Sequence, residues 1–358
     1  RDDLDEQYES LAREMDSFLD ELTDADNIEQ LEQETQYSRL VIKDNEVKFE
    51  DHLSSSIDDL DQFIETLDID KLEARNITID EKATRNIKEI IIDTTQGEIV
   101  FESSLDAVEH MSVGRLLHQQ LGKTEVYIKD NFDVKSTIIT DGTSINLSGH
   151  NLSGFVTSLS FDEHQQYGGS IKILANEAPI NSSLKITKIK NLYFDKLANE
   201  EVIRDVKPIY FSGSADVENI RINTHVELNG TMSTRHLNAG EGSKLVINDE
   251  GILSIDLENQ DSIDGQVFDF TSERSKLVIH PEQEAQPIFI DNGISPSADN
   301  KGVLVFKKAK NEATGDDDKT QIQTTNLGTE GNALFSIVFA DNILDNQSEV
   351  KVFADNIL

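Results

Sequence analysis

The N-terminal segment places apolar and polar residues with the period of an α-helix. Its apolar residues lie four, three, four, three and four positions apart, so they share one stripe while Asp, Glu, Arg and Ser occupy the other faces. The stripe consists of Leu4, Tyr8, Leu11, Met15, Phe18 and Leu22. Thr23, with Asp26 three positions later, is a start signal for a second helix that ends near Tyr37. We therefore expect a helical hairpin.

Two further patterns complete the first 75 residues. The runs 40–42 and 47–49, separated by Asp44 and Asn45, predict a pair of strands joined by a turn. Two serines then precede another amphipathic stretch, residues 57–67. We expect residues 1–75 to form an acidic, mainly α-helical segment.

The period changes from helical to alternating at about Asn76. Short runs at 77–79, 89–92 and 98–101 indicate strands, and 105–121 is predicted to be a helical insertion. Fifteen short apolar runs follow at intervals of about ten residues, each bounded by Asn, Asp, Gly or Ser. These runs are 126–128, 137–139, 145–147, 156–161, 171–174, 184–189, 192–194, 209–211, 220–222, 226–228, 236–237, 245–247, 252–257, 267–270 and 277–279.

Repeated sequences favour a solenoid. Residues 243–247 (Ser-Lys-Leu-Val-Ile) recur at 275–279, an offset of 32 that corresponds to three strands of about ten residues, and residues 338–344 recur word for word at 352–358. In a β-helix, three strands make one turn, and Asn, Asp and Gly occupy the left-handed corners. An antiparallel β-sandwich would space its strands in the same way. The paucity of Asn-Gly hairpin signals and the repeat favour the β-helix, over residues 76–358.

Composition and charge exclude several function classes. The chain has 358 residues and a formal net charge of −37, and residues 1–70 alone hold 24 Asp or Glu against 5 Lys or Arg. Such a chain repels phosphates, so we expect neither a nucleic-acid partner nor membrane binding through a basic patch. It contains no Cys, which excludes disulfides and thiolate chemistry. An acidic stretch near 309–319 is predicted to be a mobile loop.

No residue pattern indicates catalysis, a cofactor or a metal site. The clusters Asn223-Thr224-His225 and Gly149-His150-Asn151 lack the pair of carboxylates that acid/base hydrolysis needs. Ser214 lacks the Gly-x-Ser-x-Gly elbow of serine hydrolases. His110 and His118 are two turns apart on the predicted helix, too far for one metal ion, and residues 315–318 lack the ligand spacing of an EF-hand.

The strand-rich half resembles a known family. The succession Val226-Glu-Leu-Asn-Gly-Thr-Met, His236-Leu-Asn-Ala-Gly and Ser243-Lys-Leu-Val-Ile-Asn-Asp-Glu-Gly, in a chain without Cys or Trp, is similar to the passenger regions of bacterial autotransporters, most nearly the surface cell antigens of rickettsiae. This resemblance covers roughly residues 124–358. It implies a right-handed parallel β-helix that is exposed on the bacterial outer surface or secreted, and that mediates adhesion to or invasion of host cells.

We therefore expect an all-β solenoid with a helical N-terminal segment, acting without enzymatic activity as a scaffold that binds a host cell-surface protein. One alternative is a polysaccharide-active β-helix enzyme of the pectin-lyase or phage-tailspike type. Another is an intracellular structural protein that assembles through its helical hairpin. The stripe that begins at Leu4 and ends at Leu22 either caps the first turn of the solenoid or contacts a partner, because both uses bury large apolar side chains.

Overall fold

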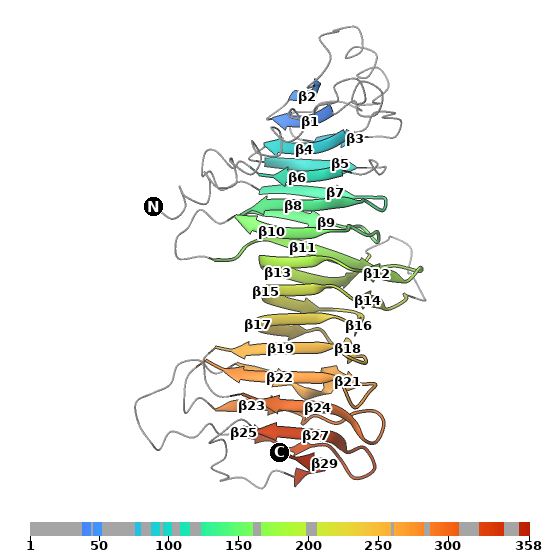
Figure 1. The fold of residues 1–358 in the computed structure, drawn as a ribbon, viewed down its shortest axis with the longest axis vertical. Helices are drawn as coiled ribbons and strands as arrows, with labels where there is room; N and C mark the ends of the chain where they lie inside the picture. Colours follow the sequence, from blue (N-terminus) through green and yellow to red (C-terminus); the bar gives the residue numbers. More distant parts are fainter. Residues whose placement is uncertain are drawn as a thin grey trace, which may run out of the picture.

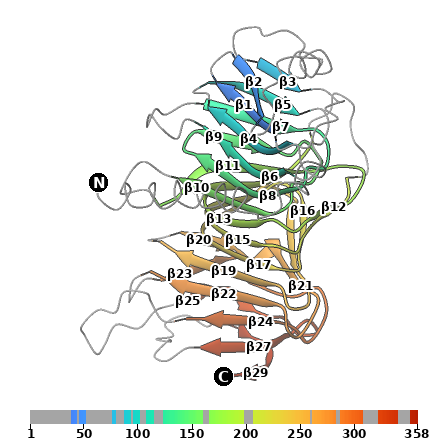
Figure 2. The same ribbon diagram turned by 45° about the horizontal axis from the view of Figure 1, so that its top comes forward.

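The computed structural model shows a tall stack of short β-strands (Figure 1, Figure 2). The residues that it describes are 38–43, 46–51, 76–79, 87–93, 96–101, 108–114, 123–159, 166–197, 206–258, 261–282, 287–307, 322–339 and 351–358. The N-terminal strands lie at one end of the stack and the C-terminal strand at the other. Within these residues no helix is long and apolar enough to cross a membrane.

The first ladder of parallel strands runs along the whole stack. Each of its strands pairs in parallel with the next one in the list. The strands are β1 (Ser38–Lys43), β4 (Ile87–Asp93), β6 (Val108–Val113), β8 (Val134–Thr140), β10 (Phe155–Leu159), β13 (Lys185–Lys196), β15 (Ser214–Ile222), β17 (Thr231–Ala239), β19 (Ile252–Leu257), β22 (Lys276–Pro281), β24 (Lys301–Phe306), β27 (Leu334–Phe339) and β29 (Ala354–Ile357).

A second ladder runs beside the first and joins it at β13. The first half of β13 pairs with β10 and its second half with β11, so this strand of 12 residues belongs to both ladders, as do β15 and β17. Lys188, with φ 57°, marks the bend where the pairing register shifts. The other strands of the second ladder are β3 (Asn76–Ile79), β5 (Gln96–Phe101), β7 (Lys123–Ile128), β9 (Thr143–Asn146) and β11 (Gly168–Ala175).

A third ladder closes the coil on its remaining side. It consists of β12 (Ile180–Ser182), β14 (Ile209–Phe211), β16 (His225–Leu228), β18 (Lys244–Ile247) and β21 (Phe268–Phe270), which are all parallel. Shorter parallel groups near the C-terminal end are β20 (Ser262–Asp264) with β23 (Ile288–Asp291) and β25 (Ile322–Thr324), and β26 (Asn326–Leu327) with β28 (Lys351–Val352). A single 3₁₀ turn, η1 (Gly265–Val267), precedes β21.

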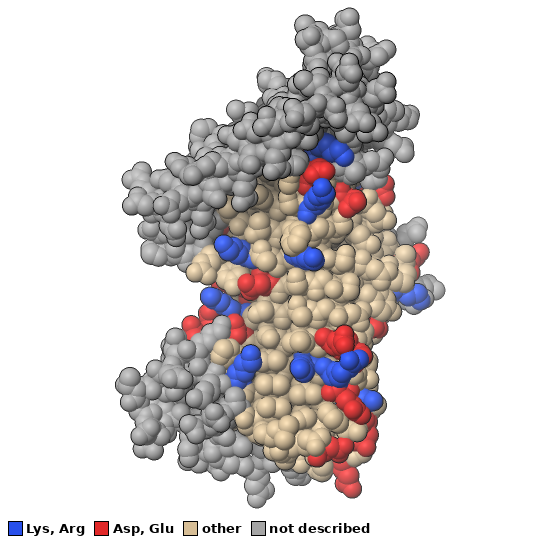
Figure 3. Space-filling model, viewed as in Figure 1, with Lys and Arg blue, Asp and Glu red and all other residues tan. Residues whose placement is uncertain are grey.

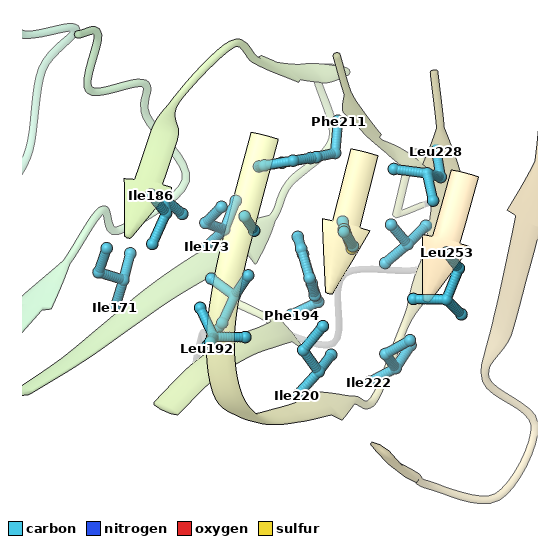
Figure 4. Close-up of a cluster of buried hydrophobic side chains, with 14 of the residues drawn as sticks. Ile171, Ile173, Ile186, Leu192, Phe194, Phe211, Ile220, Ile222, Leu228 and Leu253 are labelled. Carbon is cyan, nitrogen blue, oxygen red and sulfur yellow. The ribbon is translucent and has the colours of Figure 1, made fainter. Parts of the chain in front are cut away.

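The interior consists of columns in which each turn of the coil places an apolar side chain on the one before it. In the first ladder, alternate residues point inward and pair in register, which brings Ile186, Ala215, Met232, Leu253 and Leu277 into one column, each at most 5% exposed. Figure 4 shows how side chains of the three ladders converge in this core. Buried apolar surface of this kind contributes roughly 25 cal/mol per Å², which makes the columns the main source of stability.

The parallel pairing confirms the solenoid and excludes the β-sandwich. Among the described strands only β1 and β2 (Glu46–Asp51) pair antiparallel, and this hairpin is the strand pair that the sequence predicts at 40–42 and 47–49. Parallel neighbours need a full turn of the coil between them, whereas a sandwich is built from antiparallel strands.

The prediction of a helical insertion at 105–121 is wrong for residues 108–113. These residues form β6, between β4 and β8 in the first ladder. Val108 and Met111 are three positions apart, as on a helix, but the burial of Met111 and Val113 follows the alternation of a strand, and the neighbouring turns supply the inward partners Ile90 and Thr137. Tertiary pairing therefore overrides the local period. Three predicted features lie outside the described residues: the helical hairpin before residue 38, the other non-strand parts of the segment up to residue 75, and the loop at 309–319.

The 32-residue repeat is not one turn of the coil. Leu245 lies in the third ladder and pairs with Phe268, whereas Leu277, its counterpart in the repeat, lies in the first ladder and pairs with Leu253. Likewise Ala354 pairs with Leu334, and not with the residue 14 positions before it. The solenoid prediction is thus confirmed although this part of its reasoning is incorrect.

Candidate interaction surface

The outer side of the first ladder forms a flat surface with few charges. Residues that alternate with the core columns on six consecutive strands point outward, and none of them is buried. They are Ser136, Ile138, Phe155, Thr157, Lys185, Thr187, Ser214, Asp216, Thr231, Ser233, Ile252 and Ser254, and we call them the ladder face. Only Lys185 and Asp216 among them carry a charge. Figure 3 shows an uncharged area in the middle of the described stack, with Lys, Arg, Asp and Glu side chains above it, below it and at its edges.

Most of the negative charge of the chain is carried by residues other than the described ones between 123 and 339. The described residues between 123 and 339 hold 16 Lys or Arg and 22 Asp or Glu, whereas the whole chain has a net charge of −37. The ladder face therefore belongs to a body that is close to neutral. A surface with little charge loses less hydration when it docks on another molecule than a strongly acidic one would.

Phe155 is the aromatic side chain on the ladder face. It is 56% exposed although it lies within a strand that is paired on both sides, with β8 and with β13. Its register partner in β13 is Lys185, whose Nζ lies 4.8 Å from the centre of the Phe155 ring. This is the distance of a cation–π contact. The ammonium group leaves much of the ring open to solvent.

A network of charged and aromatic side chains lies where the first and second ladders meet. The Tyr167 hydroxyl lies 3.3 Å from Oδ1 of Asp216, and the Arg235 guanidinium lies 5.3 Å from the centre of the Tyr167 ring. Arg235 also pairs with Glu258 at 2.9 Å. Burial raises the pKa of Tyr167, the nearby Asp216 carboxylate adds to the increase, and the Arg235 charge opposes it. Side chains from four different turns of the coil are linked in this way.

Histidines extend this network along the next turns. His236 Nδ1 lies 2.6 Å from Oδ2 of Asp261, and its Nε2 lies 3.8 Å from Glu258. One turn further on, His280 Nδ1 lies 3.4 Å from Oδ1 of Asp256. We call Tyr167, Asp216, Arg235, His236, Asp256, Glu258, Asp261 and His280 the bend network. Each carboxylate of the bend network contacts another of its members, so its polar groups satisfy one another.

Stacked amides cover the adjoining part of the second ladder. Asn219 Nδ2 donates to Oδ1 of Asn191 at 3.0 Å, and Asn191 Nδ2 donates to the Ser170 hydroxyl at 3.2 Å, so that consecutive turns are joined by side chains as well as by backbone. Towards the N-terminal end, Lys172 Nζ pairs with Glu125 at 2.9 Å. Burial, together with a hydrogen bond to Glu125, raises the pKa of Tyr127 to about 12.

The clusters singled out from the sequence prove to be corner and surface residues. Asn223 Nδ2 donates to Asp195, and His225 lies 3.8 Å from Glu227 at the start of β16. His150 follows Gly149, whose φ is 81°, and donates its backbone N–H to Leu147 in a corner turn. Ser214 starts β15 on the ladder face. None of them meets a pair of carboxylates in these contacts.

Of the residues considered as metal ligands from the sequence, His110 is described, and it has a structural role. His110 lies on β6, not on a helix, and its Nδ1 lies 2.6 Å from the Ser136 hydroxyl. Within the described residues no group of three His, Asp or Glu side chains could hold a metal ion. His118 and residues 315–318 lie outside the described part of the chain, as does the predicted partner-binding stripe that begins at Leu4.

Comparisons with known proteins give no match: no family model, no curated protein and no solved structure is similar to this chain at a significant level. No sequence motif marks the ladder face or the bend network, because their members lie up to 118 residues apart and are brought together only by the winding of the coil. The one local signal is that Phe155, a large apolar residue, directly precedes the strand predicted at 156–161 and is not part of it.

Proposed function

We propose that this protein is a non-enzymatic scaffold that binds a host cell-surface protein through the ladder face. In this proposal it is a right-handed β-helical passenger of the autotransporter type, exposed on the surface of a bacterium or secreted. The observation that carries the proposal is the flat, nearly uncharged outer side of the first ladder in a strongly acidic chain. The resemblance of residues 124–358 to autotransporter passengers supports the bacterial setting.

The dimensions of the ladder face set a limit on how it binds. Six strands at about 4.8 Å spacing span about 24 Å, and four residues along each strand span about 13 Å, which together give roughly 300 Å². A stable protein interface buries about 800 Å² on each partner. A partner must therefore also contact the adjoining corners, or else bind weakly and rely on many copies of the scaffold.

The geometry of the ladder face also favours binding over catalysis. Flat surfaces make poor active sites because they cannot exclude water or surround a reacting group, whereas ligand pockets bury most of the ligand. The outward Ser and Thr hydroxyls offer hydrogen bonds without a large desolvation penalty. They suit the rim of a protein interface, with Phe155 as its apolar centre.

Charged residues on the ladder face test this function. The double variant Thr157→Arg, Ser233→Arg should bind host cells at least about tenfold more weakly in flow cytometry, because a partner would have to desolvate two guanidinium groups. The control is Asn181→Arg, an exposed position on the third ladder. Equal binding by the double variant and the unchanged protein would contradict the proposal, provided that circular dichroism shows both to be folded.

The alternative is a polysaccharide-active enzyme, and the bend network is its best candidate site. Asp216, Asp256, Glu258 and Asp261 lie on stacked turns, as the acids of β-helix hydrolases would have to. Each of them already contacts a phenol, guanidinium or imidazole group, so a sugar would have to displace these partners before the carboxylates could act on it. Release of reducing sugar from acidic polysaccharides, abolished by Asp256→Asn, would replace the adhesion proposal.

A further inference from the structure

Phe155 differs from the other exposed large apolar residues of the described chain. Those others, Val352, Ile357 and Leu358, all belong to the last eight residues, whereas Phe155 lies in the middle of the stack. On a strand in the interior of a sheet, alternate residues point to the solvent and can be polar. The register neighbours of Phe155 on the solvent side are Ser136 and Lys185. The exposed ring therefore stands alone among small and polar side chains.

The surroundings of Phe155 are the most basic part of the described chain. β13 carries Lys185, Lys188, Lys190 and Lys196 with a single acid, Asp195. Lys185 and Lys188 are both exposed, and neither forms an ion pair with a carboxylate among the residues that the structure describes. Of these lysines, Lys185 is the one that contacts the Phe155 ring, so a cation without a carboxylate partner among the described residues lies beside the ring.

The chemistry of this position suits a ligand with one flat apolar side and one negative charge. The exposed ring accepts C–H groups, and the Lys185 ammonium beside it binds an anion. The hydroxyls of Thr157, two residues after Phe155 on β10, and of Ser214, the register partner of Lys185 on β15, can exchange hydrogen bonds with hydroxyl groups. An extended peptide lacks a way to bind here by strand addition, because β10 is already paired on both sides. A carboxylated sugar residue combines all three features.

We propose that Phe155 and Lys185 form a binding site for a carboxylated sugar residue, whose ring stacks on Phe155 while its carboxylate pairs with Lys185. The site deepens the proposed function in one respect: a sugar of this kind would be carried by the cell-surface partner. Binding of the sugar itself does not depend on that function, so the two can be tested separately.

The probes are methyl β-D-glucuronide and methyl β-D-glucoside, which differ only in the carboxylate. Saturation-transfer difference NMR should show both sugars contacting the protein, with dissociation constants in the millimolar range and a preference of about two- to fivefold for the glucuronide, as expected for one exposed ion pair. Phe155→Ala should abolish both signals. Lys185→Gln should remove the preference but leave the glucoside signal, and 0.5 M NaCl should have the same effect.

The matched control is Lys276→Gln. Lys276 occupies the same outward column, four strands along from Lys185, and its register neighbours are Ile252 and Val303, so it has no aromatic partner. It should leave both signals unchanged. Absence of glucuronide binding at 10 mM, or binding that survives Phe155→Ala, would overturn the site. A Glu-containing peptide that competes at this position while the glucuronide does not would assign it to protein instead.

Failure of the site and failure of the proposed function are distinguishable. If the glucuronide does not bind but the double variant Thr157→Arg, Ser233→Arg loses cell binding, the ladder face still contacts a protein and only the sugar site is wrong. If the glucuronide binds and cell binding is unaffected by that variant, the sugar site stands and the protein-binding role of the ladder face is wrong.

Discussion

A methyl group added at Gly302 should destabilise the stack locally and strongly. Gly302 is the second residue of β24, has φ of +80°, and donates its backbone N–H to the Ser272 carbonyl at 2.9 Å. A Cβ at this position would lie 2.5 Å from Cγ of Phe270, and two further ring carbons lie within 2.8 Å. Phe270 is 1% exposed and cannot move aside without displacing other core residues.

Two physical terms add in Gly302→Ala. A non-glycine residue in the left-handed region costs about 1–2 kcal/mol, and forcing an extra carbon into a packed core costs about 1–3 kcal/mol. The expected loss is therefore about 2–5 kcal/mol. Gly242→Ala is the control, because Gly242 has φ of +73° but nothing within 4 Å of the added carbon, so that only the first term applies.

The assay is native-state hydrogen exchange measured by mass spectrometry, because a solenoid responds to a defect through its nearest turns and not through one global transition. Peptides from β21, β22 and β24 should exchange about 30- to 4,000-fold faster in Gly302→Ala, since each 1.4 kcal/mol corresponds to a factor of ten. Peptides from β8 to β11 should not change. If the two variants accelerate exchange equally in their own turns, the close approach of Gly302 to Phe270 does not exist.

Other measurements address the polar groups. Because the folded-state pKa of Tyr127 is raised to about 12, its stabilising contribution is present below pH 10 and is lost as the pH rises from 10 to 12. Tyr127→Phe should reduce that alkaline loss by about 1 kcal/mol, the full shift being discounted because the side chain is partly exposed to solvent, and absorbance at high pH should show one late-titrating tyrosine fewer. Asn219→Ala removes the hydrogen bond to Asn191 and should lower the free energy of unfolding of that turn by about 1 kcal/mol, again by hydrogen exchange; no change would mean that water replaces the amide. Arg274 pairs with Asp249 and Glu250 on an exposed corner, and the Arg274 guanidinium lowers the pKa of Asp249. Arg274→Gln should still leave the thermal midpoint unchanged, since solvent screens such pairs, and a clear decrease would refute that expectation.

The alternating half of the sequence predicts its strands well because each strand has one buried side. Val226 and Leu228 are fully buried in β16, with the polar Glu227 between them, and the run at 226–228 coincides with the described strand. The alternation predicts two strands at 184–189 and 192–194, whereas the structure has one strand, β13, in this part of the chain. Lys188 takes a left-handed conformation without interrupting the strand, and nothing in its side chain indicates this.

The candidate surface could not be predicted in the same way. Tyr167 and Asp216 lie 49 residues apart along the chain and are brought together by two turns of the coil, so their contact depends on the length of every corner between them. An error of one residue in a register would turn Phe155 inward and Val156 outward. The outward side therefore carries little sequence information of its own, because any residue that is soluble and fits a strand is acceptable there.

The differences in corner length explain why the coil has no fixed repeat and why its regular faces and its corners contribute differently to binding. Ser214 pairs with Thr231, 17 residues later, whereas Lys301 pairs with Leu334, 33 residues later, yet the paired strands keep the same spacing in the ladder. Insertions and deletions at corners thus change the coil's outline without disturbing the core columns. The ladder face is regular for this reason and can supply contact area to many partners, but a regular surface discriminates poorly among them. Specificity must come from features that break the regularity, which on the described surface are the single exposed ring of Phe155, the Lys185 ammonium beside it, and the corners whose lengths differ from turn to turn.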